Sequence, residues 1–87
     1  MYLGQKQAET LALLADSPIT SSSVVQNVSE LVRAGEVALA FDTLCSWLYE
    51  DSLPISRSFY ERLLSLSVEL DEPESIAQLD ELIADLT

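Results

Sequence analysis

Carboxylates at helical spacing are the side chains of this sequence best placed to do chemistry. Asp42, Ser46 and Glu50 follow one another at intervals of four residues, and Tyr49 lies beside them. A second group of acids occurs between Leu63 and Thr87, a stretch without Lys or Arg. Its members are Glu69, Asp71, Glu72, Glu74, Asp80, Glu81 and Asp85. Such carboxylates can transfer protons, coordinate a cation or bind Lys and Arg side chains of another protein.

Proton transfer and metal binding are the weaker interpretations of these acids. A catalytic carboxylate is usually desolvated, whereas the acids on these polar helical faces are expected to be exposed to water. The acidic stretches lack the glycine and ligand spacing of an EF-hand loop. The chain has no His and no Gly-rich phosphate loop, so a His-activated nucleophile and phosphate chemistry are unsupported. We therefore expect a protein that is not an enzyme and holds no metal or cofactor.

The overall charge favours a cationic protein as the partner. The 87 residues include 15 acids and 4 bases, which gives a formal net charge of -11. Such a surface repels nucleic acid and anionic membranes and attracts basic proteins. Acidity also keeps a small protein soluble, so the charge alone leaves both interpretations open.

One serine could carry a covalent group. Asp51-Ser52-Leu53 spells the tripeptide at which acyl carrier proteins receive their phosphopantetheine arm. A carrier serine begins a long helix after an extended loop. Here an amphipathic helix runs into Glu50 and Asp51, and Pro54 follows Ser52 after one residue. A carrier modified on Ser52 is therefore the alternative interpretation, and a helix connector is the favoured one.

The single cysteine, Cys45, indicates a reducing compartment. One Cys cannot form a disulfide within the chain, and Cys45 lies on an apolar helix face where a core position is expected. The apolar run at residues 11–15 is too short for a secretory signal, and no segment is long enough to span a membrane. We expect a cytoplasmic protein.

Prolines and a glycine divide the chain into the helices that must position these residues. Apolar residues recur at helical spacing between breaks at Pro18, Gly35 and Pro54, and no segment alternates as a strand would. Serines suited to capping the helices that follow are Ser21, Ser22, Ser23, Ser56 and Ser58. The pattern predicts a single all-α domain over residues 1–87, with four to five short helices packed as a bundle or orthogonally.

The last predicted helix carries much of the negative charge. Asp71 is expected to cap it, with Pro73 near its start. One face of this helix would present Glu74, Gln78, Glu81 and Asp85. Like charges on one face repel each other, and a cationic partner would relieve that repulsion.

Aromatic residues border the acids of the third predicted helix. Tyr49 and Trp47 lie near Asp42 and Glu50, and carboxylates beside amphipathic aromatics suit a basic protein surface. A lone Trp in a small domain is commonly part of the core, so we expect Trp47 to pack on a neighbouring helix.

The residues from Ser29 to Ser56, SELVRAGEVALAFDTLCSWLYEDSLPIS, followed by FYERLLSLSVEL, carry a family resemblance. This half of the chain resembles the MafI-type immunity proteins of bacterial polymorphic and contact-dependent growth inhibition toxin systems. In those small proteins a helix ends at Gly or Asn before an acid, and an "A…LC..L.E" helix follows. A "PIS/T" connector then leads to a helix with an early Tyr. The matching positions are Gly35, Glu36, Ala40, Leu44, Cys45, Leu48, Glu50, Pro54, Ile55, Ser56 and Tyr60.

The resemblance implies a cytoplasmic antitoxin that neutralises the toxic C-terminal domain of one cognate toxin, often a ribonuclease. It implies no catalytic residue, and it makes EDSLPIS a helix connector. We expect a monomer in a 1:1 complex, without nucleic acid or membrane as partner. The surface argument supplies the toxin-binding residues: Asp42, Ser46, Tyr49, Glu50, Asp51, Glu72, Glu74, Glu81 and Asp85. The alternatives are the carrier modified on Ser52 and an acidic helical adaptor.

Overall fold

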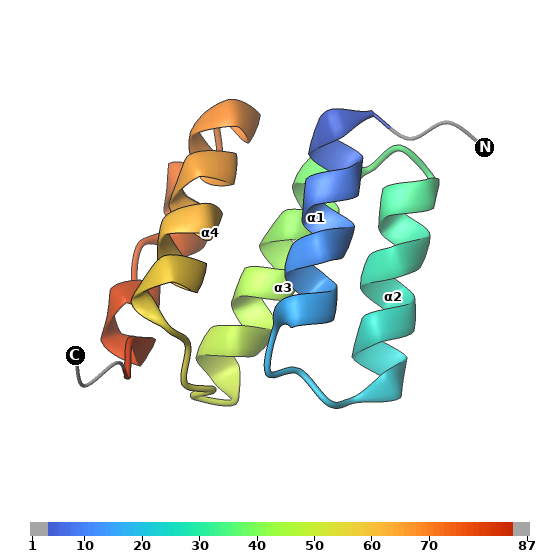
Figure 1. Cartoon of the computed structure of the whole chain (residues 1–87). Helices are drawn as coiled ribbons and strands as arrows, with labels where there is room; N and C mark the ends of the chain where they lie inside the picture. The colour runs from blue at the N-terminus through green and yellow to red at the C-terminus, as the bar shows by residue number, and fades with distance from the viewer. Residues whose placement is uncertain (1–3, 85–87) are drawn as a thin grey trace.

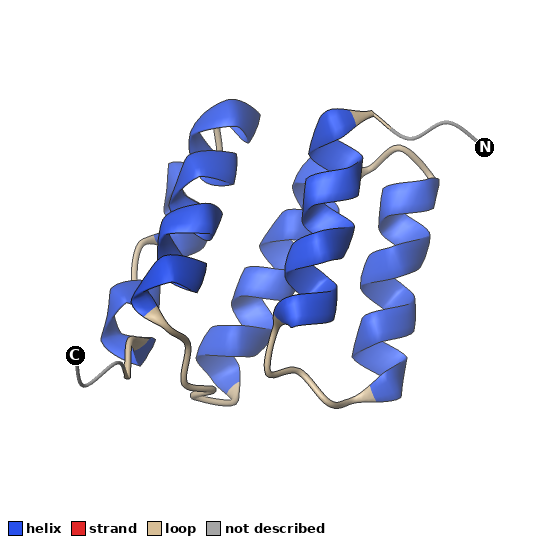
Figure 2. Cartoon of the chain, viewed as in Figure 1, coloured by secondary structure: helices blue, strands red, loops and turns tan. Residues whose placement is uncertain are grey.

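The computed structural model describes residues 4–84, and its elements are helical. They are α1 (Gln5–Asp16), α2 (Ser22–Arg33), α3 (Val37–Glu50), α4 (Arg57–Leu70) and two short 3₁₀ helices, η1 (Pro73–Ile76) and η2 (Leu79–Leu82). Figure 2 draws no strand within residues 4–84, where β pairing is limited to an isolated bridge between Ile55 and Ile83. The predicted all-α class is confirmed.

Serines begin two of the helices. The Ser21 hydroxyl accepts the N–H of Val24 at 3.5 Å at the start of α2, and the Ser56 hydroxyl accepts the N–H of Phe59 at 3.0 Å at the start of α4. Each bond satisfies a donor that has no partner within its own helix. Of the two candidates before α4, the cap is therefore Ser56 and not Ser58.

Three helices end with the chain in the left-handed region, in the Schellman arrangement. The left-handed residues are Gly35 (φ 84), Ser52 (φ 50) and Asp71 (φ 57). After each of them, a backbone N–H returns to a carbonyl of the preceding helix. These bonds are Glu36 to Leu31 at 2.9 Å, Leu53 to Leu48 at 3.0 Å and Glu72 to Ser67 at 2.8 Å. Gly35 was expected in this role; Asp71 was expected to start a helix and instead ends α4, because its left-handed backbone turns the chain away.

Successive α-helices run in opposite directions, as in an up-and-down bundle (Figure 1). Helix α1 packs against the other three, and α2 packs against α3. The buried core draws residues from every α-helix and both 3₁₀ helices: Leu13, Leu14, Val24, Val28, Val32, Ala40, Phe41, Leu44, Cys45, Leu48, Ile55, Phe59, Leu63, Leu66, Ile76 and Leu79. Their spacing follows the helical period that the sequence displays.

The segment after Asp71 differs from the single helix that was predicted there. Two 3₁₀ helices occupy residues 73–82; η1 packs against α3 and α4, and η2 against α3. This path buries Ile76 and Leu79, while a straight helix would align like charges that have no cation four residues away. The end of the segment is fixed by backbone bonds from Ile55 N–H to the Leu82 carbonyl at 3.0 Å and from Ala84 N–H to the Ile55 carbonyl at 2.9 Å.

Candidate functional site: an acidic face on α3 and the 3₁₀ segment

The structure brings the two predicted acidic groups together. Ser75 in η1 donates its hydroxyl hydrogen to Oδ1 of Asp42 in α3 at 2.9 Å. This bond joins residues 33 positions apart in the sequence. The acids of the third helix and those of the C-terminal segment therefore lie on one surface. The sequence alone indicated two separate acidic groups.

Two open grooves lie on this surface, and Tyr49 lines both of them. The first has a volume of about 330 Å³, and its lining includes Asp42, Ser46 and Glu74. The second is larger, at about 710 Å³, and is lined in part by Glu50 and Glu81. Tyr49 lines both grooves and is 39% exposed.

We call this surface the acidic face and define it by Asp42, Ser46, Tyr49, Glu50, Glu74 and Glu81. All six residues are exposed. Among residues 4–84, those that line the two grooves include no Lys or Arg. Among these carboxylates, Asp42 accepts a hydrogen bond from the neutral hydroxyl of Ser75.

The remaining predicted residues lie beside or beyond the acidic face. Asp51 is exposed at the end of α3, next to Glu50. Glu72 is half-buried before η1 and lines neither groove. Asp85 lies outside the residues that the structure describes. Ser75 and Gln78 also line the first groove. Gln78 was expected on one helix face with Glu74 and Glu81, whereas Ser75 was not predicted, because no spacing rule links η1 to α3.

Trp47 is more exposed than expected. The sequence predicts that Trp47 packs on a neighbouring helix, yet 38% of its surface is accessible, and Leu39 on the same helix is 50% exposed. The inner side of α3 is already filled by Phe41, Leu44 and Leu48, so Trp47 remains at the edge of the helix packing.

Ser52 lies in the turn that ends α3. It is exposed, has a left-handed backbone, and its N–H bonds to the Tyr49 carbonyl at 3.1 Å. The next helix, α4, begins only at Arg57. Ser52 thus closes one helix and does not open another, as the connector interpretation expects.

Cys45 is a core residue beneath the acidic face. It is 1% exposed, and burial, followed by the negative charge of Asp42, raises the pKa of its thiol. Burial disfavours the thiolate, which is the reactive form. The expected structural role of Cys45 is consistent with this environment.

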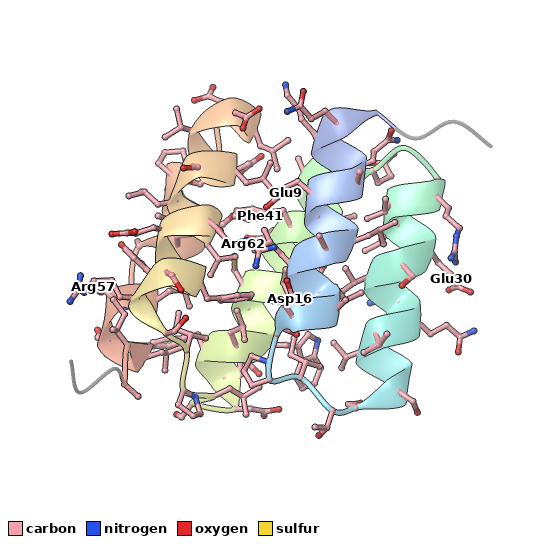
Figure 3. All side chains as sticks on the ribbon, in the orientation of Figure 1. Glu9, Asp16, Glu30, Phe41, Arg57 and Arg62 are labelled. Carbon is pink, nitrogen blue, oxygen red and sulfur yellow. The ribbon has the colours of Figure 1, made fainter. Side chains whose placement is uncertain are left out.

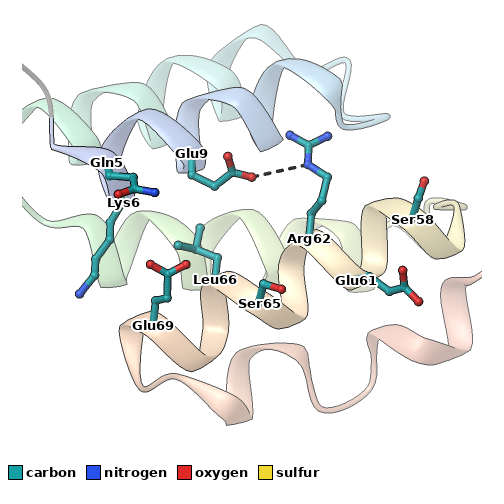
Figure 4. A pocket seen from close by; sticks show the side chains of 9 residues that line it. All are labelled: Gln5, Lys6, Glu9, Ser58, Glu61, Arg62, Ser65, Leu66 and Glu69. Atoms are coloured by element: carbon teal, nitrogen blue, oxygen red, sulfur yellow. Dashed lines mark ion pairs between the residues drawn. The ribbon is translucent and has the colours of Figure 1, made fainter.

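A different charge pattern occurs on the opposite side of the molecule, in a groove of about 380 Å³ between α1 and α4. Arg62 of α4 pairs with two acids of α1: its Nη1 is 2.9 Å from Oδ2 of Asp16, and its Nε is 3.5 Å from Oε2 of Glu9. Figure 3 shows this arginine reaching across from α4, and Figure 4 shows its pair with Glu9 inside the groove. The hydrogen bond to Asp16 is the main cause of a raised pKa for Arg62. Lys6 also lines this groove.

Residues 4–84 contain no cluster of three or more His, Cys, Asp or Glu side chains arranged to hold a metal ion. Within that same range, each helix is too short or too polar to cross a membrane. No family model, curated protein or solved structure matches this chain.

Proposed function

We propose that this chain is an immunity protein that binds and neutralises the toxic C-terminal domain of a cognate polymorphic or contact-dependent growth inhibition toxin in the cytoplasm. The observation that carries the proposal is the acidic face, with two open grooves that are lined by carboxylates and by no Lys or Arg in the described part of the chain. The resemblance of residues 29–56 to MafI-type immunity proteins supplies the class of partner.

Inhibition would follow from charge complementarity. A ribonuclease must hold phosphates with Lys and Arg, so its active site presents the opposite charge to the acidic face. The net charge of -11 would steer the two proteins together, and a docked acidic face would then exclude RNA from the basic surface. The inhibitor needs no catalytic group for this mechanism.

The position of Ser52 supports this proposal over the carrier alternative. A phosphopantetheine arm needs a serine at the start of a helix, and Ser52 is held in a turn after α3. Intact mass after incubation with a phosphopantetheinyl transferase tests the alternative directly, since a gain in mass on Ser52 would favour it.

The primary test is calorimetry with the C-terminal domain of the toxin encoded beside this chain, at low and at high salt. We expect a tight 1:1 complex that weakens as salt rises. Asp42→Lys combined with Glu50→Lys should weaken binding by about 100-fold or more, because attraction becomes repulsion at both grooves.

A matched control places the same charge change in the other groove. Glu61→Lys combined with Glu69→Lys alters the net charge by the same amount, but both residues line the α1–α4 groove. If long-range steering alone caused the effect, the two double variants would lose the same amount of toxin affinity. Equal losses would remove the acidic face as the interface, and no binding by the unmodified chain would end the proposal.

A further inference from the structure

Large apolar side chains are exposed unevenly over the molecule. Within residues 4–84, those with substantial exposure are Leu39, Trp47, Tyr49, Leu64 and Val68, and the first three belong to α3. Leu39 is 50% exposed and Trp47 is 38% exposed. Single exposed apolar residues are ordinary, but several on one helix beside a charged surface indicate a candidate interaction surface.

Leu39, Thr43 and Trp47 form a row along the outer side of α3. They are spaced four residues apart, so they lie above one another on the helix surface. The Thr43 hydroxyl donates to the Leu39 carbonyl at 2.8 Å and is therefore satisfied within the helix. A protein that covers this row therefore needs no polar group to satisfy Thr43, and the surface it would contact is mainly apolar.

The acidic residues of α3 form the adjacent row. Asp42, Ser46 and Glu50 are also four apart, and each lies three residues after a member of the apolar row. The opposite side of α3 faces the core, and α1 lies in front of it in Figure 1. The outer side of α3 therefore shows an apolar row and an acidic row, side by side.

The complement of two such rows is an amphipathic cationic helix. A helix of that kind has an apolar stripe at three- and four-residue spacing with Lys or Arg along its edge. Its stripe would cover Leu39 and Trp47, and its cations would meet Asp42 and Glu50, whose grooves contribute no cation of their own. Charge complementarity selects this occupant over an acidic or neutral one.

We propose that the outer side of α3 docks an amphipathic cationic helix of the partner protein, with Leu39 and Trp47 as the apolar anchors and Asp42 and Glu50 as the cation-binding edge. This rests on the proposed function in that the helix would belong to the toxin domain. The two rows then have separate duties. The acids set the association rate and its salt dependence, and the apolar row sets the dissociation rate.

The lone tryptophan of the chain reports on this docking. Trp47 is the only Trp, so its fluorescence should shift to shorter wavelength when a partner covers it. The probe is a synthetic Leu/Lys peptide of about 18 residues, long enough to form a helix on binding, with its Leu residues on one helical face. A scrambled peptide of identical composition and a Leu/Glu peptide with the same pattern are the controls.

We expect saturable binding and a blue shift with the patterned cationic peptide alone. Leu39→Ser should weaken this binding by about tenfold. The matched variant Leu64→Ser removes a side chain of similar exposure, 42%, from α4 and should leave binding within about twofold. Equal binding of patterned and scrambled peptides, or equal losses in the two variants, would overturn the proposal.

The toxin domain separates this inference from the proposed function. If the toxin binds and Leu39→Ser leaves its dissociation rate unchanged, the apolar row is not an anchor, while the immunity role stands. If the patterned peptide binds with the expected shift and the toxin does not, the docking surface stands and the immunity role fails.

Discussion

The α1–α4 groove and the acidic face contain the same kind of acid and use it differently. In the α1–α4 groove, Arg62 lies within 3.5 Å of Glu9 and within 2.9 Å of Asp16, so the acids tie two helices of the chain together. On the acidic face, the partner of Asp42 within residues 4–84 is the neutral hydroxyl of Ser75, at 2.9 Å. Acids that are neutralised within the chain serve its fold, and acids that lack a cation in their groove are available to a partner.

The largest expected effect concerns the thiol beneath the acidic face. Cys45 should react with a thiol reagent about 1000-fold more slowly in the native protein than in urea, because burial hides it and raises its pKa. The measurement is the rate of labelling by a chromogenic disulfide. Rapid labelling of the native protein would show that the 3₁₀ segment separates from α3 easily. The acidic face would then not be a fixed surface.

The next effect is on stability, through the residue that anchors η2. Leu79 is 1% exposed, so Leu79→Ala should lower the free energy of unfolding by about 2–4 kcal/mol in urea denaturation. Leu66→Ala, at an equally buried site that lines the α1–α4 groove, should cost a similar amount. Only Leu79→Ala should speed Cys45 labelling in native buffer. If both variants speed labelling alike, the two regions open as one unit.

The sequence predicted the four α-helices well and two of their C-terminal ends poorly. The breaks at Pro18, Gly35 and Pro54 and the helical stripes give the four α-helices, because local propensity and core packing agree there. Ser52 and Asp71 also end helices in the left-handed region, yet neither is a glycine, so neither signals this in the sequence. The same difficulty led to Asp71 being assigned to the start of a helix.

The candidate site was recovered in part for a related reason. Asp42, Ser46, Tyr49 and Glu50 share a helix face, and helical periodicity alone finds them. Whether they share a surface with Glu74 and Glu81 depends on where η1 and η2 pack. The Ser75–Asp42 hydrogen bond that joins the two parts spans 33 residues of sequence. Helical periodicity carries no information across such a separation.

A smaller effect is expected from the cation of the α1–α4 groove. Arg62→Met should lower the free energy of unfolding by about 1 kcal/mol at low salt, a modest amount because the side chain is 38% exposed. The loss should shrink in 1 M NaCl if the charge pairs cause it. Arg62 also lies 5.8 Å from the centroid of the Phe59 ring, so a loss that salt leaves unchanged would point to that contact.

The smallest effect is a gain. Glu74→Gln combined with Glu81→Gln should raise the free energy of unfolding by about 0.5 kcal/mol at low salt, since it relieves repulsion on the acidic face. Glu61→Gln combined with Glu69→Gln should give no gain, because Arg62 and Lys6 line the same groove as those acids. Thermal unfolding at low and high salt measures both. If the second pair of substitutions raised the free energy of unfolding as much as the first, the two surfaces would not differ in charge repulsion.

The bridge between Ile55 and Ile83 also has a kinetic consequence. Its two backbone bonds close a loop of roughly 30 residues that contains α4, η1 and η2, and such a closure costs about 3 kcal/mol of chain entropy beyond a constant. Because this entropy is lost before the bridge contributes any stability, we expect the bridge to form late in folding. Changes at this bridge should therefore leave the folding rate nearly constant and accelerate unfolding, which would shorten the lifetime of the folded chain.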